Sequence, residues 1–526
     1  MVDSGVQQPG TVCPSDGGEL DACPSTPLDQ IPAVVWNARV AQRDWAGMSF
    51  KIRAKRVLAL ARRMLERREE VLDIMGLEMG RGRADSLLSE LTVVVNYAKG
   101  AVKVARTALK SDKVKLSSLE FPGKRVVVEA VPRGVIGLIT PWNYPLMQCY
   151  RPLFHALLAG NGVVLKPSEH TPRTGAWLVE VCNEVLPPGL VGIVQGAGAH
   201  GAALVEAELD GLVFTGSCRT GRKVSARAGE LLLPCSVELG GTDAAIVLAD
   251  CDLERTVAGI THWSMHNAGQ DCSSIERVYV EEAIADQFVA RLAAAIGALT
   301  VSPSEGEADI GPLQNQAQLR WVEQVVTEAV SAGATCVVGG KPTGNGFGYL
   351  PTLLDHCTGE MTVVKEETFG PVLAVVRVKQ GVDAVALVNA VDYGLNGSVW
   401  TKSLQWGEAL ARQLDVGIAL VNNHSFPGVI PQVPWTGMKG TGTGVAASRH
   451  GYAVYVRRRT IVVDRSRKPE VFWFPANADL LALGHAVADL SLGAIGRVTT
   501  LLPLLKKRTR AIQERVSTPK LSDRQD

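Results

Sequence analysis

The stretch Val135–Ile139 reads Val-Ile-Gly-Leu-Ile and opens a series of short apolar runs that decides the fold. Similar runs recur at 163–165, 193–194 and 212–214, separated by segments long enough for helices. Runs that are apolar without alternation are typical of strands in a parallel sheet covered by helices on both faces. The pattern therefore predicts an α/β domain with a Rossmann-like, nucleotide-binding layout.

A second series of strand candidates begins near Ser236, at 244–248, 277–280, 372–376 and 418–422. We expect these runs to form a second α/β domain. Upstream, residues 32–109 carry apolar side chains near helical spacing, which predicts helices that pack against the first sheet. Residues 124–131 follow the Pro122-Gly123 turn and predict a projecting hairpin.

These patterns predict five parts in chain order. We expect a flexible N-terminal tail at 1–29, a cofactor-binding domain at 30–235 with an oligomerisation hairpin inserted at 118–132, a catalytic domain at 236–425, a return segment with an oligomerisation strand at 426–465, and a C-terminal extension with an amphipathic apolar segment at 466–526. An isolated hairpin is marginal in water, so the small β element predicts a homodimer or homotetramer.

Composition excludes several classes of function. The 526 residues carry a formal net charge of +1, which gives no general attraction to nucleic acid. The ten cysteines show neither CxxC pairs nor Cys/His clusters at zinc spacing, so we expect no metal site and no disulfide framework. The N-terminus lacks the apolar core of a secretion signal, and a cytoplasmic location is expected.

One thiol and one carboxylate indicate the chemistry. Cys272 lies in Asn267-Ala268-Gly269-Gln270-Asp271-Cys272, 34 positions (272 − 238) after Glu238 of the run Val237-Glu238-Leu239-Gly240-Gly241. A thiolate can attack a carbonyl and hold the product as a thioester, and a carboxylate can activate the water that releases it. The pair predicts an enzyme that works by two-step acyl chemistry.

Two glycine patterns compete for a cofactor phosphate. Residues 196–201 match GxGxxG after a short strand, but a tight turn explains this match equally well in a chain with 53 glycines. Residues 214–221 also follow a strand and open a helix, whose backbone N–H groups and Ser217 could meet a phosphate. We favour the second loop.

From about residue 32 to 463 the chain resembles the aldehyde dehydrogenase superfamily, with local similarity to bacterial semialdehyde dehydrogenases. The resemblance is carried by six segments in family order: Thr140-Pro141-Trp142-Asn143-Tyr144-Pro145, Leu165-Lys166-Pro167-Ser168-Glu169, Glu238-Leu239-Gly240-Gly241, Gly269-Gln270-Asp271-Cys272, Glu366-Glu367-Thr368-Phe369-Gly370-Pro371 and Pro434-Trp435-Thr436-Gly437-Met438-Lys439-Gly440. The run that follows Cys272, Ser273-Ser274-Ile275-Glu276-Arg277, carries the similarity to the semialdehyde enzymes.

The resemblance implies a role for each matching residue. Cys272 would be the nucleophile, Asn143 would hold the oxyanion and Glu238 would activate the deacylating water. It also implies NAD as the cofactor, with NADP left open, because a carboxylate near the ribose accepts from a 2′-OH and repels a 2′-phosphate. The cofactor residues would be Thr140, Pro141, Trp142, Lys166, Ser168, Glu169, Gly216, Ser217, Gly221, Leu239, Glu367 and Phe369.

Several alternatives stay open at this stage. The substrate could be a semialdehyde such as succinate semialdehyde, for which Arg151 is a candidate carboxylate anchor. The apolar segment after residue 470 ends in Lys506-Lys507-Arg508 and suits peripheral contact with a membrane, which would favour a long-chain aldehyde. A CoA-acylating enzyme and a catalytically impaired scaffold are the remaining readings. The last follows from Asp271, whose charge beside Cys272 should oppose thiolate formation unless the side chain points away.

Overall fold

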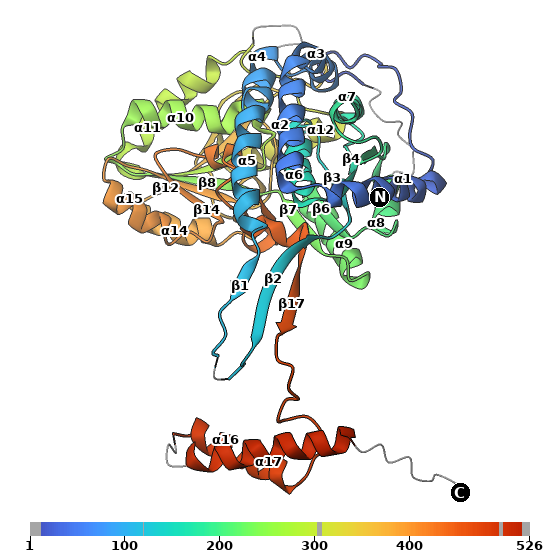
Figure 1. Cartoon of the computed structure of the whole chain (residues 1–526). Coiled ribbons are helices and arrows are strands. Elements are labelled where there is room, and N and C mark those ends of the chain that lie inside the picture. Colours follow the sequence, from blue (N-terminus) through green and yellow to red (C-terminus); the bar gives the residue numbers. More distant parts are fainter. Residues whose placement is uncertain (1–11, 119, 302–307, 494–497, 518–526) are drawn as a thin grey trace, which may run out of the picture. The chain divides into compact units, whose positions relative to one another are not determined.

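The computed structural model describes residues 12–118, 120–301, 308–493 and 498–517 (Figure 1). By their contacts the residues divide into two units. One consists of Met1–Lys110 with Ala130–Arg458, and the other of Ser111–Glu129 with Arg459–Asp526. The first unit contains two large sheets and a two-stranded one, and it holds every catalytic and cofactor residue predicted above.

The first sheet has five parallel strands in the order β5-β4-β3-β6-β7. Their bounds are β3 Val135–Ile139, β4 Gly162–Lys166, β5 Val191–Ile193, β6 Gly211–Gly216 and β7 Cys235–Leu239. This confirms the predicted Rossmann-like sheet. It also corrects the expected boundary at residue 236, because β7 pairs with β6 and Glu238 therefore lies at the end of a strand of the first sheet.

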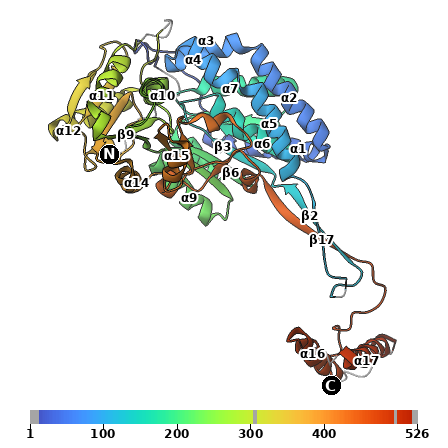
Figure 2. The same cartoon turned by 90° about the vertical axis from the view of Figure 1, so that its left-hand side faces the viewer.

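Helices cover both faces of this sheet, and alternate strand residues enter two separate cores. Ile136 and Leu138 pack in one core, whereas Val135 and Ile139 pack in the other. The first core is built with α2 Phe50–Glu66, α3 Arg68–Met79, α5 Val94–Ala108, α6 Met147–Ala159 and α7 Pro172–Val185, and the second with α1 Ile31–Gly47, α8 Gly198–Val205 and α9 Cys218–Glu230 (Figure 2). The short α4 Arg83–Ser86 and the turn η2 Leu87–Leu91 connect α3 to α5.

The second sheet has seven strands in the order β10-β11-β12-β9-β8-β13-β14, of which β10 alone runs antiparallel to its neighbour. Four strands match the predicted runs: β8 Asp243–Val247, β9 Ile275–Glu281, β12 Val372–Val378 and β14 Ile418–Val421. Three strands were not predicted: β10 Thr335–Val338, β11 Thr352–Asp355 and β13 Asn396–Trp400. The strand β13 begins Asn-Gly-Ser, and these residues are buried although their composition is typical of a turn.

The helices of the second sheet are α10 Leu253–Met265, α11 Glu282–Gly297, α12 Gln316–Ser331, α13 Thr362–Lys365, α14 Gly381–Asn389 and α15 Leu404–Ala411. Again alternate strand residues face different cores: Ala244 and Ile246 pack on one side of β8, Ala245 and Val247 on the other. The short strands β15 Trp435–Thr436 and β16 Val445–Ala446 pair with each other near the end of this unit.

The predicted flexible tail at 1–29 is corrected by the structure from residue 12 onward, while residues 1–11 lie outside the described residues. The carbonyl of Pro14 accepts a hydrogen bond from the N–H of Phe347 (2.8 Å), and the N–H of Thr26 donates to the carbonyl of Gln195 (3.0 Å). Cys13 is buried as well. The polar composition of these residues predicted a flexible tail. The structure shows that they are ordered although they contain no apolar run, because their backbone groups form hydrogen bonds with distant segments.

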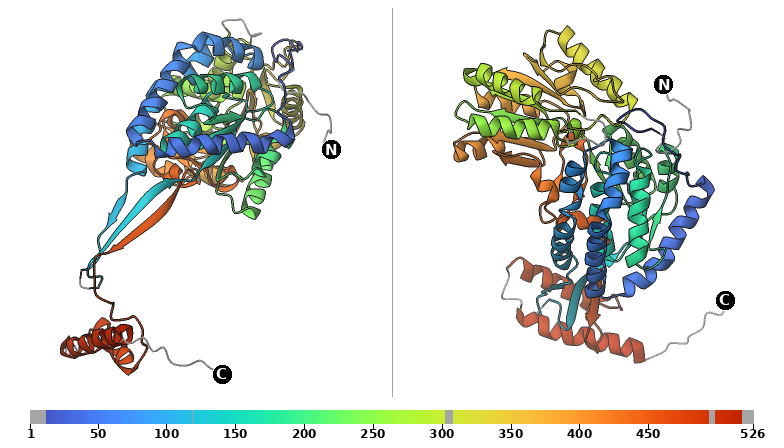
Figure 3. Two further views of the ribbon diagram at one scale, coloured as in Figure 1. Left: turned by 45° about the vertical axis from the view of Figure 1, so that its right-hand side comes forward. Right: turned by 90° about the horizontal axis from the view of Figure 1, so that it is seen from above.

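The second unit contains most of a small sheet, whose strands β2 and β17 continue into the first unit, and two helices. The sheet has the order β1-β2-β17, formed by Asp112–Val114, Lys124–Pro132 and Val456–Asp464 (Figure 3). The helices α16 Ala478–Ser491 and α17 Val498–Ser517 contact each other. Among the described residues, none of the helices is long and apolar enough to cross a bilayer.

Candidate active site

Cys272 lies where three cavities of the first unit meet. A cavity of about 870 Å³ extends over the carboxyl ends of the first sheet, and a second of about 620 Å³ opens among α4, α6 and α10. The third is a chamber of about 30 Å³ that is shared by Cys272, Arg151 and Glu238. Its size is near the volume that one water occupies in the liquid. The thiol can therefore be reached from three directions, each lined by different chemistry.

The loop that presents Cys272 is held by an unusual backbone. Asn267, Ala268 and Gly269 all have positive φ (52°, 56° and 67°), which aims the next residues at the cavities. A Cβ at Gly269 would lie 2.0 Å from the carbonyl of Gly370, so only glycine fits. Gln270 then donates to the carbonyls of Asn267 (3.1 Å) and Pro312 (3.2 Å). These contacts fix the nucleophile before substrate binds.

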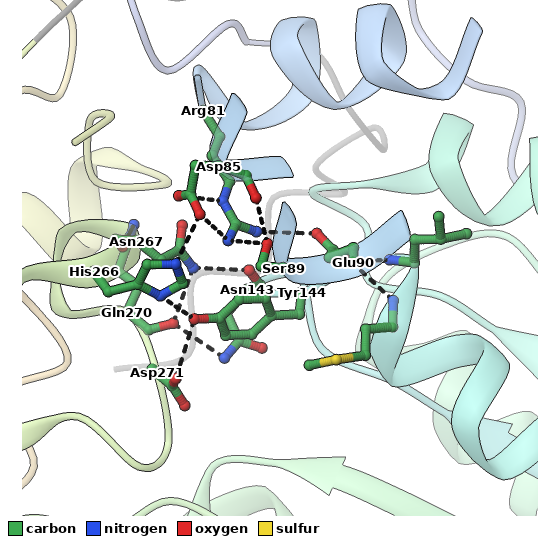
Figure 4. Close-up of polar contacts among 12 residues, drawn as sticks. Arg81, Asp85, Ser89, Glu90, Asn143, Tyr144, His266, Asn267, Gln270 and Asp271 are labelled. Atoms are coloured by element: carbon green, nitrogen blue, oxygen red, sulfur yellow. Dashed lines mark hydrogen bonds and ion pairs between the residues drawn. The ribbon is translucent and has the colours of Figure 1, made fainter. Parts of the chain in front are cut away.

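Asn143, the expected oxyanion donor, is bound to the same loop. Its Nδ2 donates to the carbonyl of Gln270 (3.1 Å), and its own carbonyl accepts from Nδ2 of Asn267 (2.8 Å) (Figure 4). The side chain is buried and lines the large cavity beside Cys272. One N–H of the carboxamide remains for an oxygen of a substrate, which is the geometry that an oxyanion donor needs.

Glu238 lines the small chamber on the other side of Cys272. It is buried, and Oε1 has no hydrogen-bond partner among the described residues. Burial raises the pKa of Glu238 to about 8, although the positive charge of Arg151 opposes the shift. A carboxyl group with this pKa can accept a proton from water near neutral pH.

The large cavity collects the residues predicted for the cofactor. Lys166 is the last residue of β4 and Ser168 follows the strand, and Nζ of Lys166 donates to Oε2 of Glu169 (3.3 Å). The wall is formed by Thr140, Pro141, Trp142, Lys166, Ser168, Glu169, Gly216, Ser217, Leu239, Glu367 and Phe369. Gly221 does not line the cavity; a Cβ there would lie 2.2 Å from Leu239, so its absence lets α9 approach β7.

Both glycine segments border this cavity. The favoured loop supplies Gly216 and Ser217, and the Ser217 side chain caps α9 by accepting from the N–H of Thr220 (3.4 Å). Gly198 and Gly201 of the other segment also lie on the wall. The elongated volume, the backbone N–H groups at the start of α9 and the Lys166–Glu169 pair suit a dinucleotide.

Glu276 holds the late cofactor segment and was not singled out from the sequence. This buried carboxylate accepts from the N–H of Thr368 (3.0 Å) and of Phe369 (2.7 Å). The ring of Phe369 then meets the ring of Trp142 edge-on, 5.5 Å between centroids. Glu367, which precedes Thr368, accepts from the N–H of Gly241 (3.1 Å). The only signal for Glu276 in the sequence was a charged residue directly before the predicted strand 277–280.

The 620 Å³ cavity has an apolar wall with a few charged groups. Met147, Trp263, Phe426, Val429 and Trp435 form much of the wall. Arg151 also lines it and is buried, and Nε and Nη2 have no hydrogen-bond partner among the described residues. Its guanidinium lies between the rings of Tyr97 (5.7 Å) and Trp435 (5.8 Å).

Asp271 does not point away from the nucleophile. Its Oδ1 lies 3.7 Å from Sγ of Cys272, and its other oxygen accepts from the hydroxyl of Tyr144 (3.0 Å). Burial and the negative charges of Asp271, Asp243 and Glu367 raise the pKa of Cys272 well above its ordinary value. The thiol is therefore protonated at rest near neutral pH.

Comparisons with known proteins give one consistent result. Residues 2–461 match the model of the aldehyde dehydrogenase family. The chain is 34% identical to the 4,4′-diapolycopene aldehyde oxidase of a Methylomonas species, over 89% of this chain and 88% of the relative. It is also 34% identical to a Mycolicibacterium smegmatis protein with the name "Putative succinate-semialdehyde dehydrogenase (NADP+)", over 85% and 87% of the two chains.

Solved structures agree with this result. Lactaldehyde dehydrogenase from Escherichia coli superposes with a TM-score of 0.82 at 31% identity, over 88% of this chain and 96% of that one. The NAD+ complex of an aldehyde dehydrogenase from Bacillus cereus gives a TM-score of 0.82 at 28% identity, over 88% and 94%.

Proposed function

Because this chain belongs to the aldehyde dehydrogenase family, which oxidises aldehydes to carboxylic acids with NAD(P)+, we propose that Cys272, Asn143 and Glu238 carry out that reaction here. The observation that carries the assignment is the position of Cys272 at the meeting point of three cavities. One cavity suits a dinucleotide, one suits an aldehyde and one holds a buried carboxyl group.

The steps follow from the chemistry of each group. Sγ of Cys272 attacks the aldehyde carbon, and the N–H of Asn143 donates to the oxygen that becomes negative. A nicotinamide bound in the large cavity would accept the hydride of the former aldehyde carbon, which leaves the thioester, and Lys166, Glu169, Glu367 and Phe369 would hold the dinucleotide there. Glu238 then takes a proton from a water in its chamber, and that water cleaves the thioester of Cys272.

We further propose an acid-ended aldehyde, a semialdehyde, as the substrate. Arg151 is buried in the wall of the 620 Å³ cavity with unpartnered N–H groups, and a carboxylate is the ligand that satisfies both the charge and these donors. The name of the Mycolicibacterium smegmatis relative refers to a substrate of this class.

The test compares succinate semialdehyde with butanal, a neutral aldehyde of the same length. Replacing Arg151 by Met should lower kcat/KM for the semialdehyde by about 10- to 150-fold relative to butanal, because a hydrogen bond to a charged group contributes about 1.5–3 kcal/mol. The ratio removes any effect of Arg151 on Glu238, which both substrates share. An unchanged ratio would exclude Arg151 as the anchor.

We also propose that NAD is preferred over NADP. The carboxylate of Glu169 lies beside Lys166 on the cavity wall, where it would accept from a ribose 2′-OH and repel a 2′-phosphate. The named relatives include both cofactors. Kinetics with each cofactor decide the preference, and Glu169→Ala should shift the ratio of kcat/KM values toward NADP.

For assembly we propose that β17 pairs with a second copy of the chain. This nine-residue strand is at the edge of the three-stranded sheet, and most of it is exposed, including Ile461 and Val462. Such an edge normally finds a partner strand. Light scattering of the purified protein should show a dimer or tetramer, and Val462→Pro should weaken it; a monomeric native protein would refute the pairing.

A second candidate concerns the C-terminal extension. The aromatic residues Phe472, Trp473 and Phe474 are 58%, 57% and 77% exposed, and Lys506 and Lys507 lie on α17. Exposed aromatics with nearby cations suit the surface of an anionic bilayer. We propose peripheral membrane contact, which would make long-chain aldehydes accessible. Cosedimentation with phosphatidylglycerol vesicles should be lost when residues 466–526 are removed, and equal partitioning of both forms would end this idea.

One assay separates the hydrolytic enzyme from two alternatives, a CoA-acylating enzyme and a scaffold without turnover. Aldehyde-dependent NADH production without CoA supports the hydrolytic enzyme, whereas a requirement for CoA would indicate a CoA-acylating one. The buried carboxyl group of Glu238 favours hydrolysis. Absence of turnover with short, acid-ended, aromatic and long-chain aldehydes would leave only a scaffold role.

A further inference from the structure

A continuous line of hydrogen-bonded groups leads away from Cys272, and the steps described above do not use it. From Asp271 beside the thiol, the line passes to the hydroxyl of Tyr144 (3.0 Å), then to Nδ1 of His266 (2.9 Å). Nε2 of His266 contacts Oδ1 of Asp85 at 2.7 Å (Figure 4). We call these four side chains, Asp271, Tyr144, His266 and Asp85, the Asp271 relay.

The far end of the relay is anchored firmly. Arg81 is buried and donates to both oxygens of Asp85 (2.7 and 2.9 Å) and to Glu90 (3.0 Å). Burial alone would raise the pKa of Asp85, but Arg81 and His266 lower it well below its ordinary value. Asp85 is therefore a fixed negative charge against one nitrogen of His266.

Glu90 connects this anchor to the segment that carries Tyr144. It accepts from the N–H groups of Leu146 (2.9 Å) and Met147 (2.8 Å) at the start of α6. The ring of Tyr144 lies under the guanidinium of Arg81 (4.7 Å) and is nearly parallel to the ring of His266 (16°). These contacts hold the hydroxyl between Asp271 and His266, so the line is built into the fold.

Counting protons shows what the relay can do. The carboxylate of Asp85 accepts from the N–H at Nε2 of His266, which leaves Nδ1 able to accept a proton. The hydroxyl of Tyr144 has one proton and lies between two acceptors, Oδ2 of Asp271 and Nδ1 of His266. When a proton reaches Oδ2 of Asp271, Asp271 can donate to Tyr144 while Tyr144 donates to Nδ1, so the relay can pass one proton from Asp271 to His266.

The thiol of Cys272 needs a nearby group that can accept its proton. It is protonated at rest, because burial and nearby negative charges oppose the thiolate. Glu238, in the chamber, has a raised pKa and is mostly protonated at neutral pH. Oδ1 of Asp271 lies 3.7 Å from Sγ and also accepts from the N–H and the hydroxyl of Ser273 (3.0 and 2.9 Å). Removal of the proton as the new bond forms avoids a free thiolate beside a carboxylate.

We propose that Asp271 is the general base of the acylation step and that Tyr144 and His266 carry the proton away from it. The S–H bond breaks as Sγ bonds to the aldehyde carbon, and the proton goes to Oδ1 of Asp271. The carbonyl electron pair moves to the oxygen held by Asn143. Because Tyr144 contacts Oδ2, the carboxyl group of Asp271 then turns about its Cβ–Cγ bond, which releases Oδ1 from Ser273 and brings the proton to the hydroxyl. The proton of Asp271 passes to Tyr144 and that of Tyr144 to Nδ1, which leaves an imidazolium against Asp85.

This proposal rests on the proposed function, and it reverses the expected effect of Asp271. If Asp271 only opposes the thiolate, Asp271→Asn should speed the reactions of Cys272. If it is the base, the same change should slow acylation. The sign of one measurement therefore separates the two readings.

The experiment measures the NADH burst by stopped flow in the full-length protein with saturating aldehyde and NAD. Asp271→Asn should slow the burst by about 10²- to 10⁴-fold, the usual contribution of a positioned base. Alkylation by iodoacetamide, which follows the thiolate population, should be equal or faster in this variant. Tyr144→Phe should slow the burst less, because Asp271 remains. Asp250→Asn removes an exposed carboxylate outside the three cavities and should leave the burst within about twofold.

The outcomes are distinct. A burst that is unchanged or faster in Asp271→Asn would overturn the proposal. If the wild-type protein gives no Cys272-dependent burst with any aldehyde, the proposed function itself fails instead. Slow alkylation in the folded Asp271→Asn protein would show a displaced loop, and this result too would count against a base role.

Discussion

The raised pKa of Glu238 predicts the pH dependence of turnover. Its carboxyl group is closed in a chamber of about 30 Å³, and burial raises its pKa to about 8. Only the deprotonated form can take a proton from water. When deacylation limits the rate, turnover should therefore be about a tenth of its maximum at pH 7 and about a hundredth at pH 6.

Arg151 allows the cause of this shift to be tested. Its positive charge is the group that lowers the pKa of Glu238, so Arg151→Met should move the rise in turnover to higher pH. Butanal is the suitable substrate, because it has no carboxylate that depends on Arg151. Glu238→Gln should give one NADH burst per site and then almost no turnover.

The assay is steady-state NADH formation between pH 6 and 9, with the burst measured at each pH. A burst followed by slower turnover shows that deacylation is limiting. The reasoning would be refuted by turnover that stays flat over this range while a burst is present. It would also be refuted if Arg151→Met moved the rise to lower pH.

Three further outcomes are expected. Cys272→Ala should abolish aldehyde-dependent NADH formation while the protein still binds NAD, as calorimetry would show; residual turnover would exclude Cys272 as nucleophile. Gly269→Ala places a Cβ 2.0 Å from the carbonyl of Gly370 at positive φ, and should lower the free energy of unfolding by about 1–3 kcal/mol or more, measured by thermal melting. Glu276→Gln weakens the acceptor for the N–H groups of residues 368–369 and should raise the KM for NAD by up to about tenfold, with an unchanged KM counting against this support.

Much of the fold could be predicted from local pattern. The bounds of β3 match the prediction at both ends, because a run of β-branched and apolar residues between polar turns has few other folded states. By contrast, β13 was missed because its polar residues are buried only through neighbours from distant parts of the chain. The order of residues 12–29 was missed for the same reason, since backbone hydrogen bonds leave no trace in composition.

The candidate site shows the same division. The residue types and their spacing singled out Cys272 and Glu238, because two-step acyl chemistry needs a nucleophile and a base, and the family resemblance added Asn143 as the amide donor. The position of Arg151 next to both the 620 Å³ cavity and the Glu238 chamber could not be predicted, since it depends on which side chains of α6 and β7 meet in the tertiary structure and on the rings of Tyr97 and Trp435.

Asp271 shows most clearly what the sequence determined and what the tertiary structure determined. The sequence by itself determined that a carboxylate precedes the nucleophile, and from that neighbour alone it predicted an obstacle to thiolate formation. Only the tertiary structure decided that this carboxylate bonds to Tyr144 and, through His266, to Asp85. These partners lie far from Asp271 in the chain or come from a different element, and a hydrogen bond forms only when packing brings donor and acceptor within about 3 Å.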